Sequence, residues 1–187
     1  MNTALLVIDV QESFRHRPYF DPAALPADLA QQNALIDGCV ALGIQVVRIL
    51  HSDGPESADN PFALASGHVR PMDGLSAFDA AASFLKHRHS ALVGTGLDVW
   101  LTENGIRRLI VSGIRTEQCC ETTTRHASDL GWTVDYVTDA THTFAMTQPD
   151  GSPLSVADIK ARTATVLSGR FCTLCTVQEA LDRSEAA

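Results

Sequence analysis

Short apolar runs alternate along the chain with segments that carry apolar residues at helical spacing. The first run, Ala4–Val10, is interrupted only by Asp9, which is typical of a strand buried on both faces of a sheet. Such alternation is characteristic of parallel α/β folds. It predicts a three-layer αβα, Rossmann-like fold with a six-stranded, mainly parallel sheet in the order 3-2-1-4-5-6.

The boundaries of the elements follow from periodicity and from glycines that end helices. The segment His51–Leu75 is rich in Gly, Pro, Asp and Ser without a clear period, so it is expected to be a long functional loop. We expect strands at Ala4–Val10, Ile44–Leu50, the last residues of Lys86–Leu92, Arg107–Ile114, Trp132–Ala140 and Phe171–Val177. We expect helices at Asp28–Leu42, Ala77–Phe84, Leu97–Asn104, Thr116–Leu130 and Ser155–Leu167, and a short one at the C-terminus.

The 187 residues are enough to bury one sizeable core, so we expect a single domain over residues 1–187. The 22 acidic residues outnumber the 14 Lys and Arg, which argues against nucleic acid or an anionic membrane as a partner. The first residues do not resemble a signal peptide, and no apolar run approaches the ~20 residues of a membrane span. We therefore expect a cytoplasmic protein whose five cysteines are reduced thiols.

Two adjacent cysteines stand in "GIRTEQCCETTTRH", just after the fourth apolar run. Thr116 is a good candidate for the N-cap of the following helix, which places Cys119 in its first turn. The unpaired N–H groups and the positive dipole end there favour an anion, so we expect a thiol that ionises readily. Cys120 falls on the side that packs against the sheet and is expected to be structural.

The expected strand order brings Asp9 and Cys119 together. Asp9 ends the first strand and Cys119 follows the fourth, and in this order the two strands are neighbours. A carboxylate at the end of a buried strand is costly unless it is paired. Lys86 is a candidate partner, since a nearby cation keeps a carboxylate ionised and lowers the pKa of a thiol; read alone, it could equally lie in a solvated turn.

Three segments together resemble the isochorismatase-like cysteine hydrolases, which include nicotinamidases and N-carbamoyl amidohydrolases. "LLVIDVQESF" resembles the family's opening strand, with its aspartate, a glutamine two residues on and a phenylalanine. "LKHRHSALVGTGL" resembles the segment that carries the family's lysine. "GIRTEQCCETTTRH" resembles the nucleophile segment, with a threonine three residues before the catalytic cysteine. The likeness extends, in order and spacing, over roughly residues 5–140.

The resemblance implies a catalytic triad of Asp9, Lys86 and Cys119. It also implies a cis peptide bond before Arg115 and an oxyanion hole formed by the backbone N–H groups of Arg115 and Cys119. In the implied mechanism Asp9 takes the thiol proton, and Cys119 attacks an amide or carbamoyl carbonyl to form a thioester. Asp9 then activates the water that hydrolyses it. Family members are commonly dimers or tetramers, so a homo-oligomer is expected.

Other residues are expected to shape the pocket of this small-molecule enzyme. Phe14 is a candidate substrate wall, and His142 lies near enough to the expected site to line its rim. Arg115 stands where relatives often carry small residues and is a candidate for binding a substrate carboxylate, although a surface salt bridge is an equal alternative. No cofactor or metal is expected, because His51, Asp53 and His68 lack the close spacing of a metal site.

Three alternatives stay open at this stage. An isochorismatase on the same fold would cleave a vinyl ether without a nucleophilic thiol. A catalytically inactive binding module would be expected to lose a triad residue, and all three are present. A redox protein would need a second cysteine that can reach Cys119, and only Cys120 is near it in sequence. The pair Cys172 and Cys175 lies within an expected strand, where this spacing points the side chains to opposite faces, so it is expected to be core packing.

Overall fold

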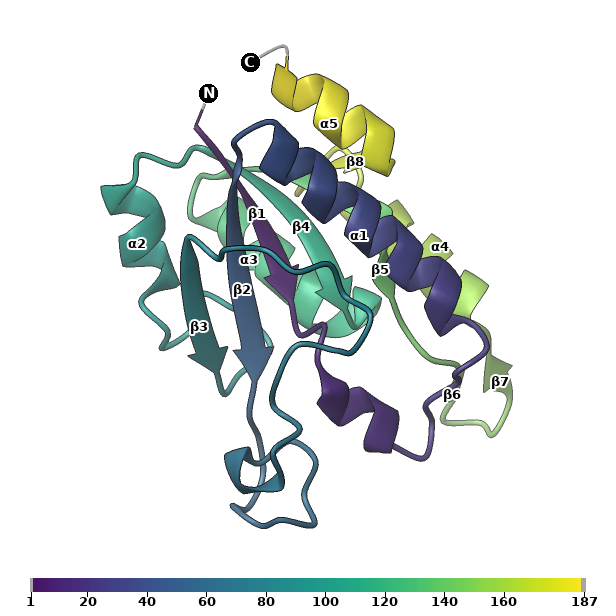
Figure 1. Ribbon diagram of the computed structural model, residues 1–187. Helices are drawn as coiled ribbons and strands as arrows, with labels where there is room; N and C mark the ends of the chain where they lie inside the picture. The colour runs from purple at the N-terminus through teal and green to yellow at the C-terminus, as the bar shows by residue number, and fades with distance from the viewer. Residues whose placement is uncertain (1, 186–187) are drawn as a thin grey trace.

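Six parallel strands form the central sheet of the computed structural model, which describes residues 2–185 (Figure 1). Their order is β3-β2-β1-β4-β5-β8, so the prediction of a Rossmann-like order is confirmed, with β8 as its sixth strand. The strands are β1 (Thr3–Ile8), β2 (Gln45–His51), β3 (Ala82–Lys86), β4 (Arg108–Ile114), β5 (Thr133–His142) and β8 (Thr173–Cys175).

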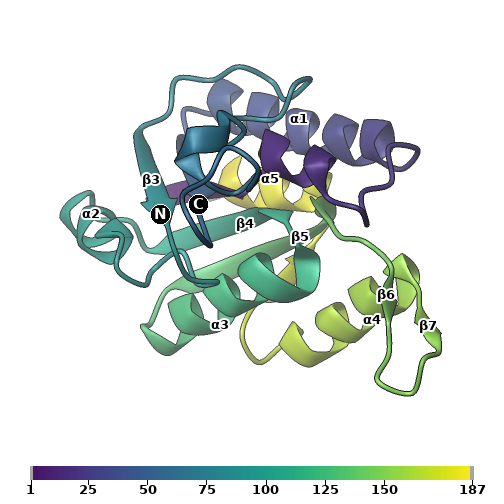
Figure 2. The same cartoon turned by 90° about the horizontal axis from the view of Figure 1, so that it is seen from below.

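Helices cover both faces of the sheet. Residues of β1 alternate between two buried clusters, as expected for a strand covered on both sides. Leu6 packs with residues of α2 (Leu97–Glu103) and α3 (Glu121–Asp129), and Leu5 packs with residues of α1 (Leu25–Ala41). Figure 2 shows α1 and α5 (Val177–Glu185) on one face, and α2, α3 and α4 (Val156–Leu167) on the other.

The prediction of a helix at Ala77–Phe84 is wrong. Residues 82–86 form β3, which pairs with β2, and Ala81 donates its N–H to the carbonyl of Val46. The third strand therefore comes earlier than expected and ends at Lys86. An alanine-rich stretch has high helical propensity, and short apolar runs do not distinguish a buried strand from a helix. Pairing with the neighbouring strand decides the structure here.

Smaller elements lie in the loops beyond the carboxyl ends of the strands. One of these loops begins with a short 3-10 helix, η1 (Glu12–His16), and the long segment after β2 contains another, η2 (Leu64–Ser66). A two-stranded hairpin of β6 (Met146–Thr147) and β7 (Pro153–Leu154), absent from our expectations, follows β5. In the part of the chain described, no helix is both long and apolar enough to span a bilayer.

The ends of β1 and β4 approach each other closely at Gly113. This residue pairs with Ile8 and has φ of 133°, a conformation that favours glycine. A Cβ atom at this position would lie 2.0 Å from the carbonyl oxygen of Ile8. Glycine therefore lets the chain leave β4 directly beside Asp9, the residue that follows β1.

Candidate active site

Asp9 and Lys86 form a buried ion pair at the carboxyl edge of the sheet. Asp9 leaves β1 with φ of 54°, and its N–H bonds to the carbonyl of Ile49 on β2 at 2.9 Å. Lys86 is the last residue of β3, and its Nζ lies 2.7 Å from Asp9 Oδ2. Both residues are 0% exposed. The lysine that could have lain in a surface turn thus compensates the buried carboxylate, as such a charge requires.

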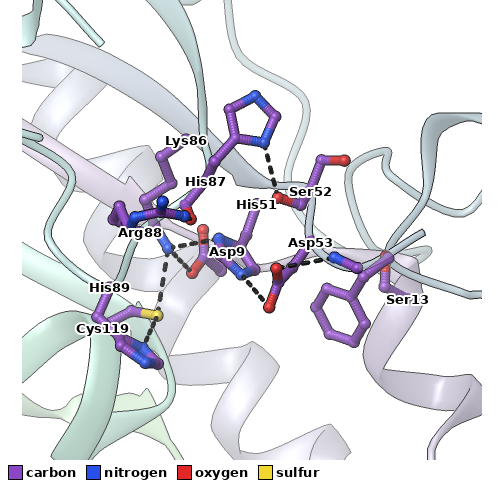
Figure 3. A network of polar contacts seen from close by, with 12 residues as sticks. Asp9, Ser13, His51, Ser52, Asp53, Lys86, His87, Arg88, His89 and Cys119 are labelled. Carbon is purple, nitrogen blue, oxygen red and sulfur yellow. Dashed lines mark hydrogen bonds and ion pairs between the residues drawn. The ribbon is translucent and has the colours of Figure 1, made fainter. Parts of the chain in front are cut away.

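The nucleophile candidate lies in a single π-helical turn, η3 (Thr116–Cys120), that leads from β4 into α3. The carbonyl of Arg115 accepts the N–H groups of Gln118 and Cys120, both at 3.2 Å, and these bonds close the turn. The Ile114–Arg115 peptide bond is cis, as the family resemblance predicts. Lys86 Nζ lies 3.2 Å from Cys119 Sγ, so the structure brings together all three residues of the expected triad (Figure 3).

Thr116 is not the N-cap that the sequence predicts. The cap position belongs to Arg115, which makes no capping side-chain hydrogen bond. The hydroxyl of Thr116 instead donates to Thr141 Oγ1 at 3.0 Å, on β5. Cys120 is completely buried and packs in the core, in agreement with its expected structural role. The π turn lies between β4 and α3, so counting helix positions from Thr116 as the N-cap did not predict the structure of this segment.

The pKa of the Cys119 thiol is raised to about 12, opposite to our expectation. Burial is the main cause and the charge of Asp9 adds to it, while Lys86 acts in the other direction. Burial also raises the pKa of Asp9, although Lys86 opposes this. Burial alone would lower the pKa of Lys86, but Asp9 and Cys119 outweigh it and raise it. The resting site therefore holds a neutral thiol beside an aspartate–lysine ion pair.

His51 supplies a third contact to Lys86 that sequence analysis did not assign. Its Nδ1 lies 3.1 Å from Lys86 Nζ. The pKa of His51 is lowered to about 4, mainly by burial and also by the charge of Lys86, so the neutral ring accepts this hydrogen bond. Gln11 holds the His51 backbone at both groups: its Nε2 donates to the carbonyl at 2.9 Å and its Oε1 accepts the N–H at 2.7 Å. The sequence signal that could have pointed to His51 was Gln11, the glutamine two residues after Asp9.

A cavity of about 310 Å³ opens onto Cys119 Sγ, a volume that suits a small molecule. Its walls include three aromatic side chains, Phe14, Tyr19 and Phe62, with Phe14 and Phe62 edge to face at 5.1 Å. Phe14 thus lies where a substrate wall was predicted. His89, another residue without an assigned role, lines the same cavity, and its Nδ1 is 3.8 Å from the sulfur.

Two arginines line the cavity and differ in their partners. Arg115, for which a substrate carboxylate and a surface salt bridge were equal alternatives, forms an ion pair with Glu117 at 3.1 Å and donates to the carbonyl of Phe144 at 3.3 Å. Arg17 is exposed, and within residues 2–185 no carboxylate lies within ion-pair distance of its guanidinium. The charge available to a ligand is therefore that of Arg17.

His142 lies away from the cavity. It is buried, its Nδ1 bonds to Asp28, and its ring packs edge to face on Phe144 at 4.7 Å. It therefore supports Phe144, whose carbonyl accepts a hydrogen bond from Arg115. The prediction that His142 lines the rim of the cavity is wrong. The strand continues to His142 and carries the side chain inward, where sequence analysis had placed a loop after Ala140.

The candidate metal trio does not come together. His51 and Asp53 are neighbours, with 3.9 Å between Nε2 and Oδ2, while His68 stacks on His16 at a ring distance of 3.7 Å. No group of three or more potential ligands suited to a metal occurs among the residues described. Cys172 and Cys175 belong to opposite buried clusters, as their spacing predicted, and both are free thiols.

Comparisons with known proteins find relatives that match most of the chain. The Isochorismatase domain model matches residues 3–170. The isochorismatase family protein YrdC of Bacillus subtilis (strain 168) is 27% identical over 184 residues, covering 96% of this chain and 94% of YrdC. Ureidoacrylate amidohydrolase RutB of Stutzerimonas stutzeri (strain A1501) is 27% identical over 172 residues, covering 75% and 69%.

Solved structures show the same architecture. A hydrolase structure of the isochorismatase family from Chromobacterium violaceum superposes with a TM-score of 0.85 at 26% identity, covering 100% of this chain and 95% of that one. The family model spans most of the chain, including Asp9 after β1, Lys86 at the end of β3 and the turn that carries Cys119. The chain belongs to the isochorismatase family of hydrolases.

Proposed function

We propose that the protein hydrolyses a C–N bond of a small amide or carbamoyl compound through a thioester on Cys119. The observation that carries this proposal is the buried Asp9–Lys86 ion pair beside a thiol that opens onto a cavity. A thiol with a pKa of about 12 is a poor nucleophile at neutral pH unless a base removes its proton as it attacks. The carboxylate of Asp9, which interacts with Cys119, is that base.

The first half-reaction follows from these positions. Asp9 takes the proton from Cys119 Sγ while the sulfur forms a bond to the substrate carbonyl carbon. The backbone N–H groups of Arg115 and Cys119 hold the oxyanion, as preorganised donors do in other acyl transfers. The C–N bond then breaks, and Asp9 returns the proton to the departing nitrogen. Lys86 remains charged throughout and keeps the returning carboxylate ionised.

The cavity supports a substrate with a planar part and a negative charge. Phe14, Tyr19 and Phe62 supply aromatic surface, and the guanidinium of Arg17 lies over the rings of Tyr19 and Phe62 without a carboxylate partner among residues 2–185. We assign a substrate carboxylate to Arg17 in preference to Arg115, because Glu117 already balances the charge of Arg115. The name of the relative ureidoacrylate amidohydrolase supports a ureido acid as the first class to test.

The test is ammonia release from a panel of primary amides, N-carbamoyl amino acids and ureido acids. Cys119→Ala should abolish the release, because no other thiol lies at the cavity among residues 2–185. Cys120→Ala is the matched control: it removes the adjacent, completely buried thiol and should retain activity. Activity that survives Cys119→Ala would contradict the proposal, and turnover of isochorismate by that variant would favour vinyl ether cleavage instead.

A further inference from the structure

The ammonium group of Lys86 has three acceptors, one for each of its N–H bonds (Figure 3). Asp9 Oδ2 lies 2.7 Å from Nζ, His51 Nδ1 lies 3.1 Å from it and Cys119 Sγ 3.2 Å. Lys86 is 0% exposed and does not line the cavity. The proposed reaction uses Asp9 and Cys119, but it leaves the third acceptor, His51, without a role.

The charge of Lys86 fixes the position of the proton on the His51 ring. An ammonium group only donates hydrogen bonds, so Nδ1 carries the lone pair and the neutral ring holds its proton at Nε2. Asp9 and Cys119 raise the pKa of Lys86, whereas burial and the charge of Lys86 lower the pKa of His51 to about 4. A charged lysine beside a neutral histidine is therefore the state of the site at neutral pH.

The acceptor on His51 is held by the backbone. His51 and Lys86 are register partners at the ends of the neighbouring strands β2 and β3. Gln11, which is 0% exposed, bonds both backbone groups of His51, and the imidazole packs edge to face on Phe62 with 5.9 Å between ring centroids. The lysine, by contrast, carries its charge on a flexible four-carbon chain. The fixed ring thus determines where the mobile ammonium group comes to rest.

An unpaired N–H on a buried ammonium group is costly, so the group would move or rotate if this acceptor were absent. Such movement matters for the proposed attack. Lys86 contacts both the sulfur that gives up the proton and the carboxylate of Asp9 that receives it. It must keep both contacts while negative charge passes from one to the other, and small errors in the position of such groups slow a reaction strongly.

We propose that His51 is a positioning residue, whose Nδ1 holds the ammonium group of Lys86 between Asp9 and Cys119. This inference rests on the proposed attack by Cys119. In this role His51 takes up no proton and forms no bond to the substrate. It acts only through the direction of the N–H bonds of Lys86.

The tautomer of His51 provides the first test, in the wild-type protein. NMR of nitrogen-labelled histidine rings, with the His51 signals identified by their loss in His51→Asn, should show a protonated Nε2 and an unprotonated Nδ1 at neutral pH. The ring should stay neutral on acidification to about pH 5, because its pKa is about 4. A proton on Nδ1 at neutral pH would overturn the assignment, since that nitrogen could not then accept from Lys86.

Two variants of similar size separate the acceptor from the packing of the ring. His51→Asn keeps an acceptor, because its Oδ1 can take the place of Nδ1, and His51→Leu removes it. The probe is p-nitrophenyl acetate, which acylates a thiol and releases p-nitrophenolate without protonation. Acylation of Cys119 should stay within about threefold of the wild-type rate in His51→Asn and fall about 10- to 100-fold in His51→Leu, as for loss of a hydrogen bond to a charged group.

Equal rates in the two variants would overturn the assignment, because a ring that only fills space would be replaced equally well or badly by either side chain. Cys119→Ala distinguishes this failure from that of the proposed function. If Cys119→Ala releases p-nitrophenolate as fast as wild type, the thioester proposal itself fails. If the release depends on Cys119 while His51→Asn and His51→Leu agree, only the role of His51 fails.

Discussion

The two sides of the Cys119 sulfur differ in how their charges are arranged. On the buried side, Asp9 and Lys86 are 0% exposed and compensate each other at 2.7 Å. On the open side, Arg17 and His89 are exposed at the cavity, and Arg17 has no carboxylate partner among residues 2–185. The buried side thus meets its electrostatic requirements within the fold, whereas on the open side the charge of Arg17 has no carboxylate partner among residues 2–185.

This difference suggests that the two sides of the sulfur have different roles in the reaction. The charges of Asp9 and Lys86, at the ends of strands, lie beside the sulfur of Cys119, which is the atom proposed to attack every substrate. Side chains on the loops around the cavity should determine which molecule enters. Changes on the buried side should therefore remove activity or stability, and changes on the open side should alter selectivity.

The largest expected effect comes from Asp9→Asn. Loss of the base should lower kcat/KM for amide hydrolysis by about 10³-fold, within the usual range for general-base catalysis. The thiol should nevertheless ionise more easily, because Asp9 contributes to the raised pKa of Cys119 and Lys86 would then face the thiolate alone. Thiolate absorbance followed against pH measures this shift. A pKa unchanged from about 12 would show that Asp9 does not control the sulfur.

Lys86→Met should destabilise the fold by about 3–5 kcal/mol, because it leaves the carboxylate of Asp9 buried without its partner. The double variant Asp9→Asn with Lys86→Met removes both charges and should recover most of this loss in urea unfolding. Burial already raises the pKa of Asp9. In the single variant that carboxyl should bind a proton on acidification, so the loss should shrink as the pH falls. Equal stabilities of the single and double variants would contradict this account.

A smaller effect is expected for Arg17→Gln on the open side. If Arg17 binds a substrate carboxylate at an exposed site, KM for acidic amides should rise about tenfold, or about 1.4 kcal/mol, with kcat nearly unchanged. Neutral amides should show no change. Arg88→Gln removes an exposed arginine that does not line the cavity and serves as the control. Equal losses for acidic and neutral amides would argue against recognition of charge.

Sequence analysis succeeded where a local pattern decides the structure. The unbroken apolar run before Asp9 identified a central strand, and the parallel order then placed Asp9 beside the segment with Cys119. The pattern failed at Ala77–Phe84, where strand pairing overrides helical propensity, and at Thr116, where hydrogen bonding to β5 replaces a helix cap. Sequence analysis considered His51 only as part of a metal trio and did not consider His89, because the contacts of both side chains are with residues far away in the chain.

The sequence, with the family resemblance that it carries, determined the parallel α/β fold, the strand order and the identity of the three residues that meet at the carboxyl edge of the sheet. Apolar periodicity is sufficient for the fold and for the place of Asp9 after a buried strand. The three residues were implied together only by the resemblance to the family, because periodicity did not place Lys86 at the end of a strand. Only the tertiary structure decided the charge state of the site. The raised pKa of the Cys119 thiol, the pairing of Arg115 with Glu117 and the exposure of Arg17 all depend on burial and on partners that the chain acquires on folding.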